Sequence, residues 1–441
     1  MPEETQSDTQ TQPKTESASA YTGHRGGLNF KGATLQGTFA SLKYRDFTLL
    51  WLGQITHAAA LWLEQTARPL LILALTDSAI HLGMVILART IPAVFLGVLA
   101  GVLADNFNRR TILVATKVMV FILSIIFALI VATGIVEIWH IYVCSFLRGA
   151  AMAFDQPARR AIIPSIVPEN LVVNAMALST GSMTAMRIIG ASGAGLLMGF
   201  YGLAAPFIVI VFVYIFALIF TWMLNPPDHE RSGYQGARRM GSDLVDGFRY
   251  SAADPTIRGV LIIGLGYFLF GMAFMQVFAP LFAKQVLGIG ETGFGFMVSV
   301  MGIGGLIGAL GLAAFSPTRN RGTLMLGFLA AFGALLVLFS GVTYLNSVVL
   351  AFIVVIFLGA GQSLFFPLMN AILVESAPEA MRGRVMGVLS LDRAMTALGG
   401  ALAGIAAGAL GVQLTQIIFG VGCLITAILM YTLYPALRRV Q

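Results

Sequence analysis

Residues 82–133 read LGMVILARTIPAVFLGVLAGVLADNFNRRTILVATKVMVFILSIIFALIVAT. A short polar stretch at 105–110 separates two apolar runs, 82–104 and 111–133. Each run is about 20 residues long, the length that an α-helix needs to cross a bilayer. The same pattern continues over most of the chain. It predicts a membrane protein built of α-helices, because a lipid environment excludes open strands.

The composition agrees with a membrane protein. The chain has 441 residues, of which 57% are hydrophobic and 11% charged, and its mean hydropathy is +0.85. About 25% of residues are charged in an average soluble protein. These values exclude a soluble enzyme, a disordered scaffold and a disulfide-rich secreted domain. Cys144 and Cys423 both lie within apolar runs and form no redox or metal-binding motif.

The order of polar and apolar segments predicts the architecture. Residues 1–45 are polar and low in complexity, which predicts a disordered cytoplasmic tail. Six apolar segments precede a polar linker at 225–256, and six follow it. These segments lie at about 47–75, 82–104, 111–133, 139–160, 170–200, 203–224, 257–283, 292–315, 323–343, 347–370, 383–408 and 412–435. We therefore predict an all-α membrane protein with twelve transmembrane helices in two six-helix bundles, 46–224 and 257–436.

The basic residues predict the orientation. The net charge is +7, and most of the 27 Lys and Arg residues fall in the tail, the linker and the loops on one side of the predicted membrane. The loops on the other side hold only Lys284. Positive loops stay in the cytoplasm, so both termini are expected there, in a multi-pass protein of the cell membrane. The same charge distribution favours contact with lipid headgroups over nucleic acid.

An internal repeat supports two equivalent halves. At an offset of about 210 residues, Pro157 matches Pro367 and Gly190 matches Gly400. Further matches at this spacing relate other segments of the two halves. Two parallel halves related by an axis along the membrane normal are a transporter architecture.

The loop at Gly101-Val-Leu-Ala-Asp105-Asn-Phe-Asn-Arg109-Arg110 resembles the signature loop of the major facilitator superfamily. The resemblance covers about 45–435 and implies a cytoplasmic gate. The gate residues it implies are Gly101, Asp105, Arg109 and Arg110. In that family the aspartate lies near the positive amino end of helix 11, and the arginines complete a charge relay. Asn106 and Asn108 replace the usual basic residue and glycine, which weakens the expected latch.

Other motifs resemble one branch of that superfamily. Phe154-x-x-Pro157-Ala, Pro168-Glu169-x-Leu171 and Arg382-Gly-Arg384 are similar to the enterobactin-exporter-like and macrolide-efflux-like proteins. The expected helix 5 carries Gly190-Ala-Ser-Gly-Ala-Gly195, which lacks the proline of the exporters' Gly-Pro-x-x-Gly-Gly motif. Small residues there still permit close helix packing.

Polar and ionisable residues inside the apolar segments are the candidate site, because they are costly in a membrane. The resemblance places them on helices that line the central cavity. The expected substrate and proton cavity comprises His57, Glu64, Arg68, Arg89, Arg148, Asp155, Arg187, Gln276, Gln362, Asn370, Asp392 and Arg393. Arginine forks suit carboxylate, phosphate or catecholate groups. An aromatic wall is expected from Tyr267, Phe270, Phe274, Phe365 and Phe366.

A structural role for these arginines is the alternative. Arg68 would then only neutralise Glu64 one turn away, and Arg148 would bond backbone carbonyls or Asp155. Glu64 is the first candidate for a residue that changes protonation during transport, followed by Asp155, Asp392 and His57.

The sequence predicts a secondary active transporter, specifically proton-coupled efflux of a small amphipathic molecule by alternating access. The cargo would be siderophore-like or drug-like and could be anionic. The alternative is an importer, a uniporter or a lipid transporter on the same fold. No catalytic motif indicates an enzyme. The expected partners are the small-molecule substrate and membrane lipids, with no nucleic acid and no cofactor beyond a proton gradient. A monomer is expected.

Overall fold

The structure is a computed structural model that describes residues 39–106, 108–225, 245–315, 320–389 and 391–439. All regular elements in these ranges are helical. Eleven of the described helical segments are long and apolar enough to cross a membrane. The prediction of an all-α membrane protein is therefore confirmed. α5 (Ile138–Ile166) is not among the eleven, because buried charged residues such as Arg148 and Asp155 lower its hydropathy, yet it packs between α3 and α4.

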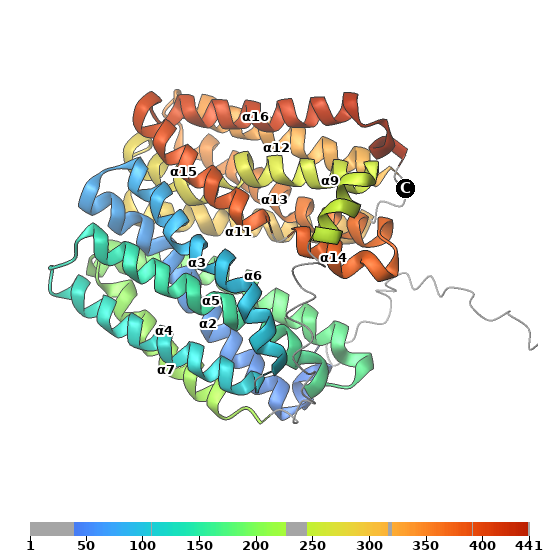
Figure 1. Ribbon diagram of the computed structural model, residues 1–441. Coiled ribbons are helices and arrows are strands. Elements are labelled where there is room, and N and C mark those ends of the chain that lie inside the picture. Colours follow the sequence, from blue (N-terminus) through green and yellow to red (C-terminus); the bar gives the residue numbers. More distant parts are fainter. Residues whose placement is uncertain (1–38, 107, 226–244, 316–319, 390, 440–441) are drawn as a thin grey trace, which may run out of the picture.

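Two groups of helices lie side by side (Figure 1). The first contains α2 (Arg45–Thr76), α3 (Ala79–Asn106), α4 (Arg109–Ala132), α5, α6 (Val172–Tyr201) and α7 (Ala205–Trp222), with short 3₁₀ turns at Ala40–Lys43 and Glu169–Leu171. The second contains α9 (Pro255–Gly266), α10 (Ala279–Leu281), α11 (Gly290–Phe315), α12 (Arg321–Thr343), α13 (Val348–Ser376), α14 (Glu379–Leu389), α15 (Asp392–Leu410), α16 (Val412–Leu433) and the 3₁₀ turn Pro435–Arg439.

Two predicted segments differ in detail from the structure. The segment expected at 257–283 is a regular α-helix as far as Gly266 and again only at Ala279–Leu281. It continues through π-helical turns at Tyr267–Gly271, Phe274–Phe278 and Phe282–Val286. The segment expected at 383–408 is interrupted between α14 and α15. π-helical turns are frequent at functional sites, and these lie beside the cavity described below.

The two groups repeat the same close helix crossing. α3 packs on α5 where Gly149 lies against the carbonyl of Arg89, and α11 packs on α13 where Gly359 lies against the carbonyl of Met301. A Cβ atom on either glycine would lie 1.9 Å from that carbonyl oxygen. The lack of a side chain is therefore what allows each pair of helices to cross so closely.

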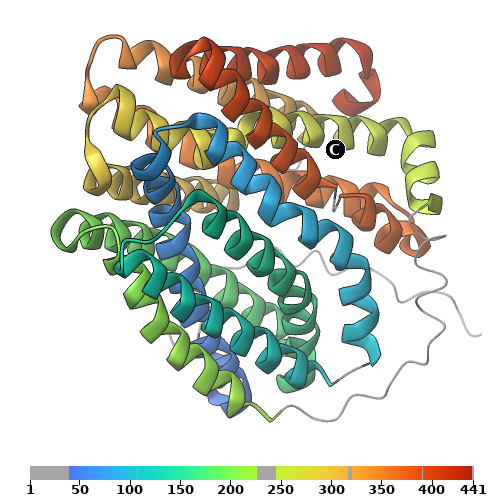
Figure 2. The same ribbon diagram turned by 60° about the vertical axis from the view of Figure 1, so that its left-hand side comes forward.

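The groups meet most closely at one end. α3 runs beside α15, as Figure 2 shows, and α6 runs beside α11. A Cβ atom on Gly83 would lie 2.4 Å from the carbonyl oxygen of Gly400, and one on Gly195 would lie 2.8 Å from that of Glu291. The hydroxyls of Ser192 and Ser299 lie 2.6 Å apart in the same region. Backbone packing therefore closes this end, which we call the closed end. The sequence predicts that it faces outward.

Candidate substrate cavity

A cavity of about 610 Å³ lies between the two groups of helices. Its walls come from α2, α3, α5 and α6 with Val120 of α4 and Tyr214 of α7 on one side, and from α13, α15 and the π-helical turns on the other. Most of the predicted site residues line it. Its charged lining consists of five arginines and two carboxylates, namely Arg68, Arg89, Arg148, Arg187, Arg393, Glu64 and Asp392. This excess of positive charge favours an anionic ligand.

Glu64 lies between two arginines. One carboxylate oxygen contacts Arg68 one turn along α2, and the other contacts Arg148 on α5. Arg148 also donates to the hydroxyls of Ser124 (3.3 Å) and Tyr214 (3.2 Å). The Glu64 side chain is only 6% exposed, so the two guanidinium groups substitute for water around its charge. The direct pairing of Arg68 with Glu64 is confirmed. In the alternative, structural interpretation Arg148 would bond Asp155 or backbone carbonyls, whereas here it pairs with Glu64 and the two hydroxyls.

Two further arginines donate to neutral groups. Arg89 donates to Gln65 Oε1 at 3.0 Å. Arg187 donates to Gln362 Oε1 at 2.8 Å, and its guanidinium carbon lies 5.4 Å from the centre of the Trp62 ring. Neutral partners leave the charge of these arginines uncompensated. They are therefore the cavity groups best placed to attract an anion.

The opposite wall is apolar with a few polar groups. Gln276, Gln362, Asp392 and Arg393 line it, as predicted, together with Phe268, Met272 and Met275. The methionines and Phe268 were not predicted, because in sequence they resemble ordinary core residues. Methionine side chains adapt to ligands of varied shape.

The predicted aromatic wall is only partly correct. Tyr267 and Phe366 line the cavity. Phe365 lies behind Tyr267 and stacks on it with ring centres 4.2 Å apart. Phe274 packs on Phe339, and Phe270 packs on Phe419. These three rings support the wall from behind.

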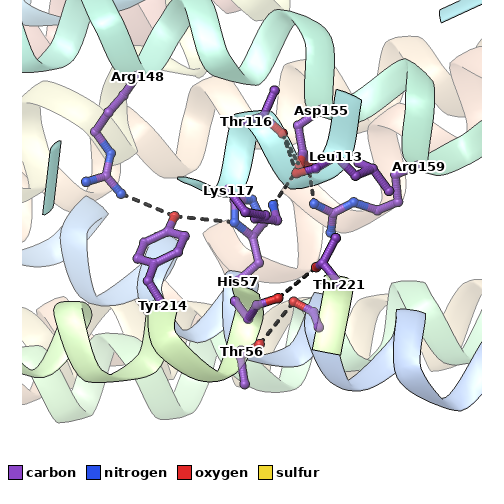
Figure 3. Close-up of polar contacts among 12 residues, drawn as sticks. Thr56, His57, Leu113, Thr116, Lys117, Arg148, Asp155, Arg159, Tyr214 and Thr221 are labelled. Atoms are coloured by element: carbon purple, nitrogen blue, oxygen red, sulfur yellow. Dashed lines mark hydrogen bonds and ion pairs between the residues drawn. The ribbon is translucent and has the colours of Figure 1, made fainter. Parts of the chain in front are cut away.

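Asp155 and Asn370 do not line the cavity, contrary to prediction. Asp155 lies inside the first group of helices, where its carboxylate binds Lys117 Nζ at 2.6 Å and also contacts Arg159 (Figure 3). Asp155 and Lys117 are 4% and 3% exposed, so this is a buried ion pair. Asn370 donates to the carbonyl of Phe366 one turn earlier in α13. Its amide is therefore bonded within its own helix.

His57 is linked through Tyr214 to Arg148. It lines the cavity, and its Nδ1 lies 3.3 Å from the Tyr214 hydroxyl, which also accepts from Arg148 (Figure 3). Tyr214 is fully buried on α7, a helix that the sequence analysis gave no polar role. Only its position in an otherwise apolar segment could have indicated such a role.

The predicted gate loop is described in part. Gly101 and Asp105 lie in the last turns of α3, and the contacts of Gly101 and of the Asp105 side chain lie outside what the structure describes. Arg110 donates to the carbonyl of Trp222 at 2.6 Å, which ties the start of α4 to the end of α7. Asn108 caps α4, because its side-chain oxygen accepts from the backbone N–H groups of Arg110 and Thr111. The unusual Asn108 therefore starts the helix.

A charged cavity between two groups of long apolar helices defines a membrane transporter of the major facilitator type. Solved structures agree on the fold. The nucleoside transporter NupG is similar with a TM-score of 0.72 and 14% identity, over 88% of this chain and 100% of that one. A D-xylose–proton symporter is similar with a TM-score of 0.66 and 13% identity, over 90% and 98% of the two chains.

The chain belongs to the transmembrane secretion effector family of the major facilitator superfamily, whose model matches residues 36–439. It is therefore a multi-pass protein of the cell membrane.

Characterised relatives cover nearly the whole chain. The staphyloferrin A transporter of Staphylococcus aureus is 24% identical over 88% of this chain and 95% of the relative. The multidrug efflux pump Tap of Mycolicibacterium fortuitum is 26% identical over 89% and 96%. The enterobactin exporter EntS of Shigella boydii is 25% identical over 89% and 92%. All three are membrane transporters of small molecules.

Proposed function

We propose that the chain is a secondary active exporter of small amphipathic molecules that carry anionic groups. The observation that carries this proposal is the cavity itself, in which five arginines face two carboxylates beside a wall of Met and aromatic side chains. The arginines would bind the acidic groups of the ligand, and the opposite wall would bind its apolar part. The names of the relatives, two siderophore transporters and a drug efflux pump, support export of such a molecule.

The proposed architecture completes the family fold. We propose α5 as a twelfth membrane-spanning helix, since it lies beside α3 and α4 and its charged residues Arg148 and Asp155 are buried. The halves at 46–224 and 257–436 would be the two bundles that move against each other, with the linker 225–256 and both termini in the cytoplasm.

Glu64 is the proposed site of proton coupling. While it is ionised, it holds Arg68 and Arg148. Protonation of Glu64 would release both guanidinium groups toward a ligand, and an anion bound there would in turn favour protonation. A proton and an anion would therefore bind together, whereas a cationic ligand would compete with the proton for Glu64.

Joint binding of a proton and an anion determines the net charge that crosses the membrane. A ligand with two negative charges that leaves with one proton still carries one net negative charge out of the cell. The membrane potential, negative inside, drives that movement by about 2.3 kcal/mol per 100 mV. Because the proton leaves with the anion, an outside-acidic pH gradient would oppose this cycle by about 1.4 kcal/mol per pH unit, and the membrane potential would supply the driving force.

Binding can be tested by thermal stability in detergent. A ligand that binds only the folded protein raises the melting temperature by mass action. We expect lipophilic polycarboxylates or catecholates to stabilise the protein, and Arg148→Ala to reduce the effect. Stabilisation by cations alone, or an unchanged response in Arg148→Ala, would contradict an anion site.

Transport can be tested in inside-out membrane vesicles, where export is seen as uptake. We expect uptake of a stabilising anion to increase when the lumen is made electrically positive. Glu64→Gln should keep this uptake but lose its dependence on pH. An anion that moves only toward the cytoplasmic side would indicate an importer instead.

A further inference from the structure

Two hydrogen bonds cross the cavity between the halves, and each joins an arginine to a glutamine. Arg187 of α6 donates to Gln362 of α13 at 2.8 Å, and Arg393 of α15 donates to Gln156 of α5 at 2.8 Å. All four residues line the cavity. We call these bonds the crossed bridges.

The crossed bridges follow the internal repeat. The same number of residues separates Gln156 from Gln362 and Arg187 from Arg393. In each bridge the glutamine comes from the fourth long helix of one half, and the arginine comes from the fifth long helix of the other. Their separation is about one helical turn shorter than the repeat offset, which shifts one bridge along the cavity relative to the other.

The crossed bridges lie deeper in the cavity, measured from the closed end, than the two arginines that contact Glu64. Measured from the closed end at about 1.5 Å per residue, Arg68 and Arg148 lie about 12 and 15 Å deep. On the same scale the bridge from Arg187 lies about 21 Å deep, and the bridge from Arg393 about 26 Å deep. The bridges are therefore farther from the closed end than the arginines that hold Glu64.

The contacts between the halves at the closed end differ from those at the crossed bridges. At the closed end backbones touch, as Gly83 and Gly404 show, and no space remains for a methyl group. At the level of the bridges, long side chains reach across a cavity. The bond from Arg393 is solvent-exposed, so water can replace it readily.

We propose that the crossed bridges are the inner gate of the cavity. This inference rests on the proposed alternating access, in which the halves separate at the cytoplasmic end to admit the ligand. The bonds would form when the gate closes and break when it opens. A neutral glutamine gives a bond of ordinary strength, so the gate can open, whereas a carboxylate at the same place would hold the arginine more strongly.

The test measures access to the cavity without a substrate. A cysteine at Thr90, on the cavity wall about 17 Å from the closed end, lies behind the bridges as seen from the cytoplasm. Inside-out vesicles expose the cytoplasmic face to a membrane-impermeant maleimide. The native Cys144 and Cys423 are buried, and the protein without the new cysteine gives the background.

We expect Gln156→Ala and Gln362→Ala each to accelerate labelling about fivefold, the shift that one ordinary hydrogen bond gives. Gln156→Glu and Gln362→Glu should slow labelling by a similar factor. Opposite effects at one position cannot come from misfolding. Gln276→Glu is the matched control, because it adds the same charge to the cavity wall and makes neither crossed bridge.

Equal slowing by Gln276→Glu would overturn the gate, because it would show an effect of charge alone. Alanine variants that label no faster than the parent would also overturn it. Failure of the ligand panel would leave these rates unaffected, so the gate and the proposed cargo are tested separately.

Discussion

Glu64 and Arg148 form a buried ion pair that joins α2 to α5, and Arg68 contacts the other oxygen of the same carboxylate. Two guanidinium groups therefore depend on one acidic side chain in the centre of the membrane domain. Arg68 and Arg148 have a structural partner, and both still line the cavity.

Replacement of Glu64 should show how much this carboxylate contributes to the stability of the fold. Glu64→Ala leaves two buried cations without a carboxylate, and breaking a buried pair typically costs about 3–5 kcal/mol. We expect a large loss of thermal stability in detergent, and a smaller loss in Glu64→Gln, whose amide oxygen still accepts a hydrogen bond. The exposed Glu379 provides the control, since Glu379→Ala should change little. Equal melting temperatures for Glu64→Ala and Glu379→Ala would refute this role.

The closed end should respond to a single methyl group. Gly83→Ala would place a Cβ atom 2.4 Å from the carbonyl oxygen of Gly400, so the halves cannot meet there unchanged. We expect faster labelling of a Thr90→Cys cavity residue from the outer face of intact cells. Gly97→Ala is the matched control in the same helix, because its added Cβ would have no neighbour within 4 Å apart from the adjoining residues and backbone of its own helix. Acceleration in both variants, or in neither, would argue against the seal.

The buried cluster at Asp155 should affect stability but not ligand choice. Asp155→Asn removes the carboxylate shared by Lys117 and Arg159, and we expect a destabilisation of about 3–5 kcal/mol. Asp246→Asn, which removes a half-exposed partner 3.6 Å from Arg384, should cost at most about 1 kcal/mol. Melting temperatures test the first point. A changed order of stabilising ligands in Asp155→Asn would show that this cluster also shapes the cavity.

The Tyr214 hydroxyl should orient Arg148. Tyr214→Phe removes an acceptor of Arg148 and the contact with His57, at a cost of about 1 kcal/mol. The bond from Arg148 to Ser124 and its pair with Glu64 remain. We expect a small fall in melting temperature and weaker stabilisation by anions. Tyr142→Phe, which removes a hydroxyl bonded to His81, should leave the anion response unchanged.

The sequence predicted the helices well, because the length and apolarity of a membrane span are local properties. It predicted less well which residues share the cavity. Asp155 is only one residue from the cavity-lining Gln156, yet their side chains face different surroundings. The spacing of residues in the sequence predicts which of them share a face of a helix. Whether that face contacts another helix or the cavity depends on tertiary packing.

Other features had no sequence signal. The π-helical turns after Gly266 change which side chains of the segment that follows α9 share a face. The average period of an α-helix cannot show this change. The crossed bridges join Gln156 to Arg393 and Arg187 to Gln362 over long separations. Nothing in the sequence distinguishes Gln156, because a single glutamine beside a charged residue is common in helices.

The closed end consists of backbone at its tightest points, and this separates two tasks in the molecule. Gly83, Gly195 and Gly404 make their contacts through main-chain atoms that every amino acid shares. The side chains that line the cavity lie elsewhere. Substitutions in the cavity wall would therefore change what fits there and leave these main-chain contacts intact. Recognition and sealing use different parts of the chain, so that one can vary without the other.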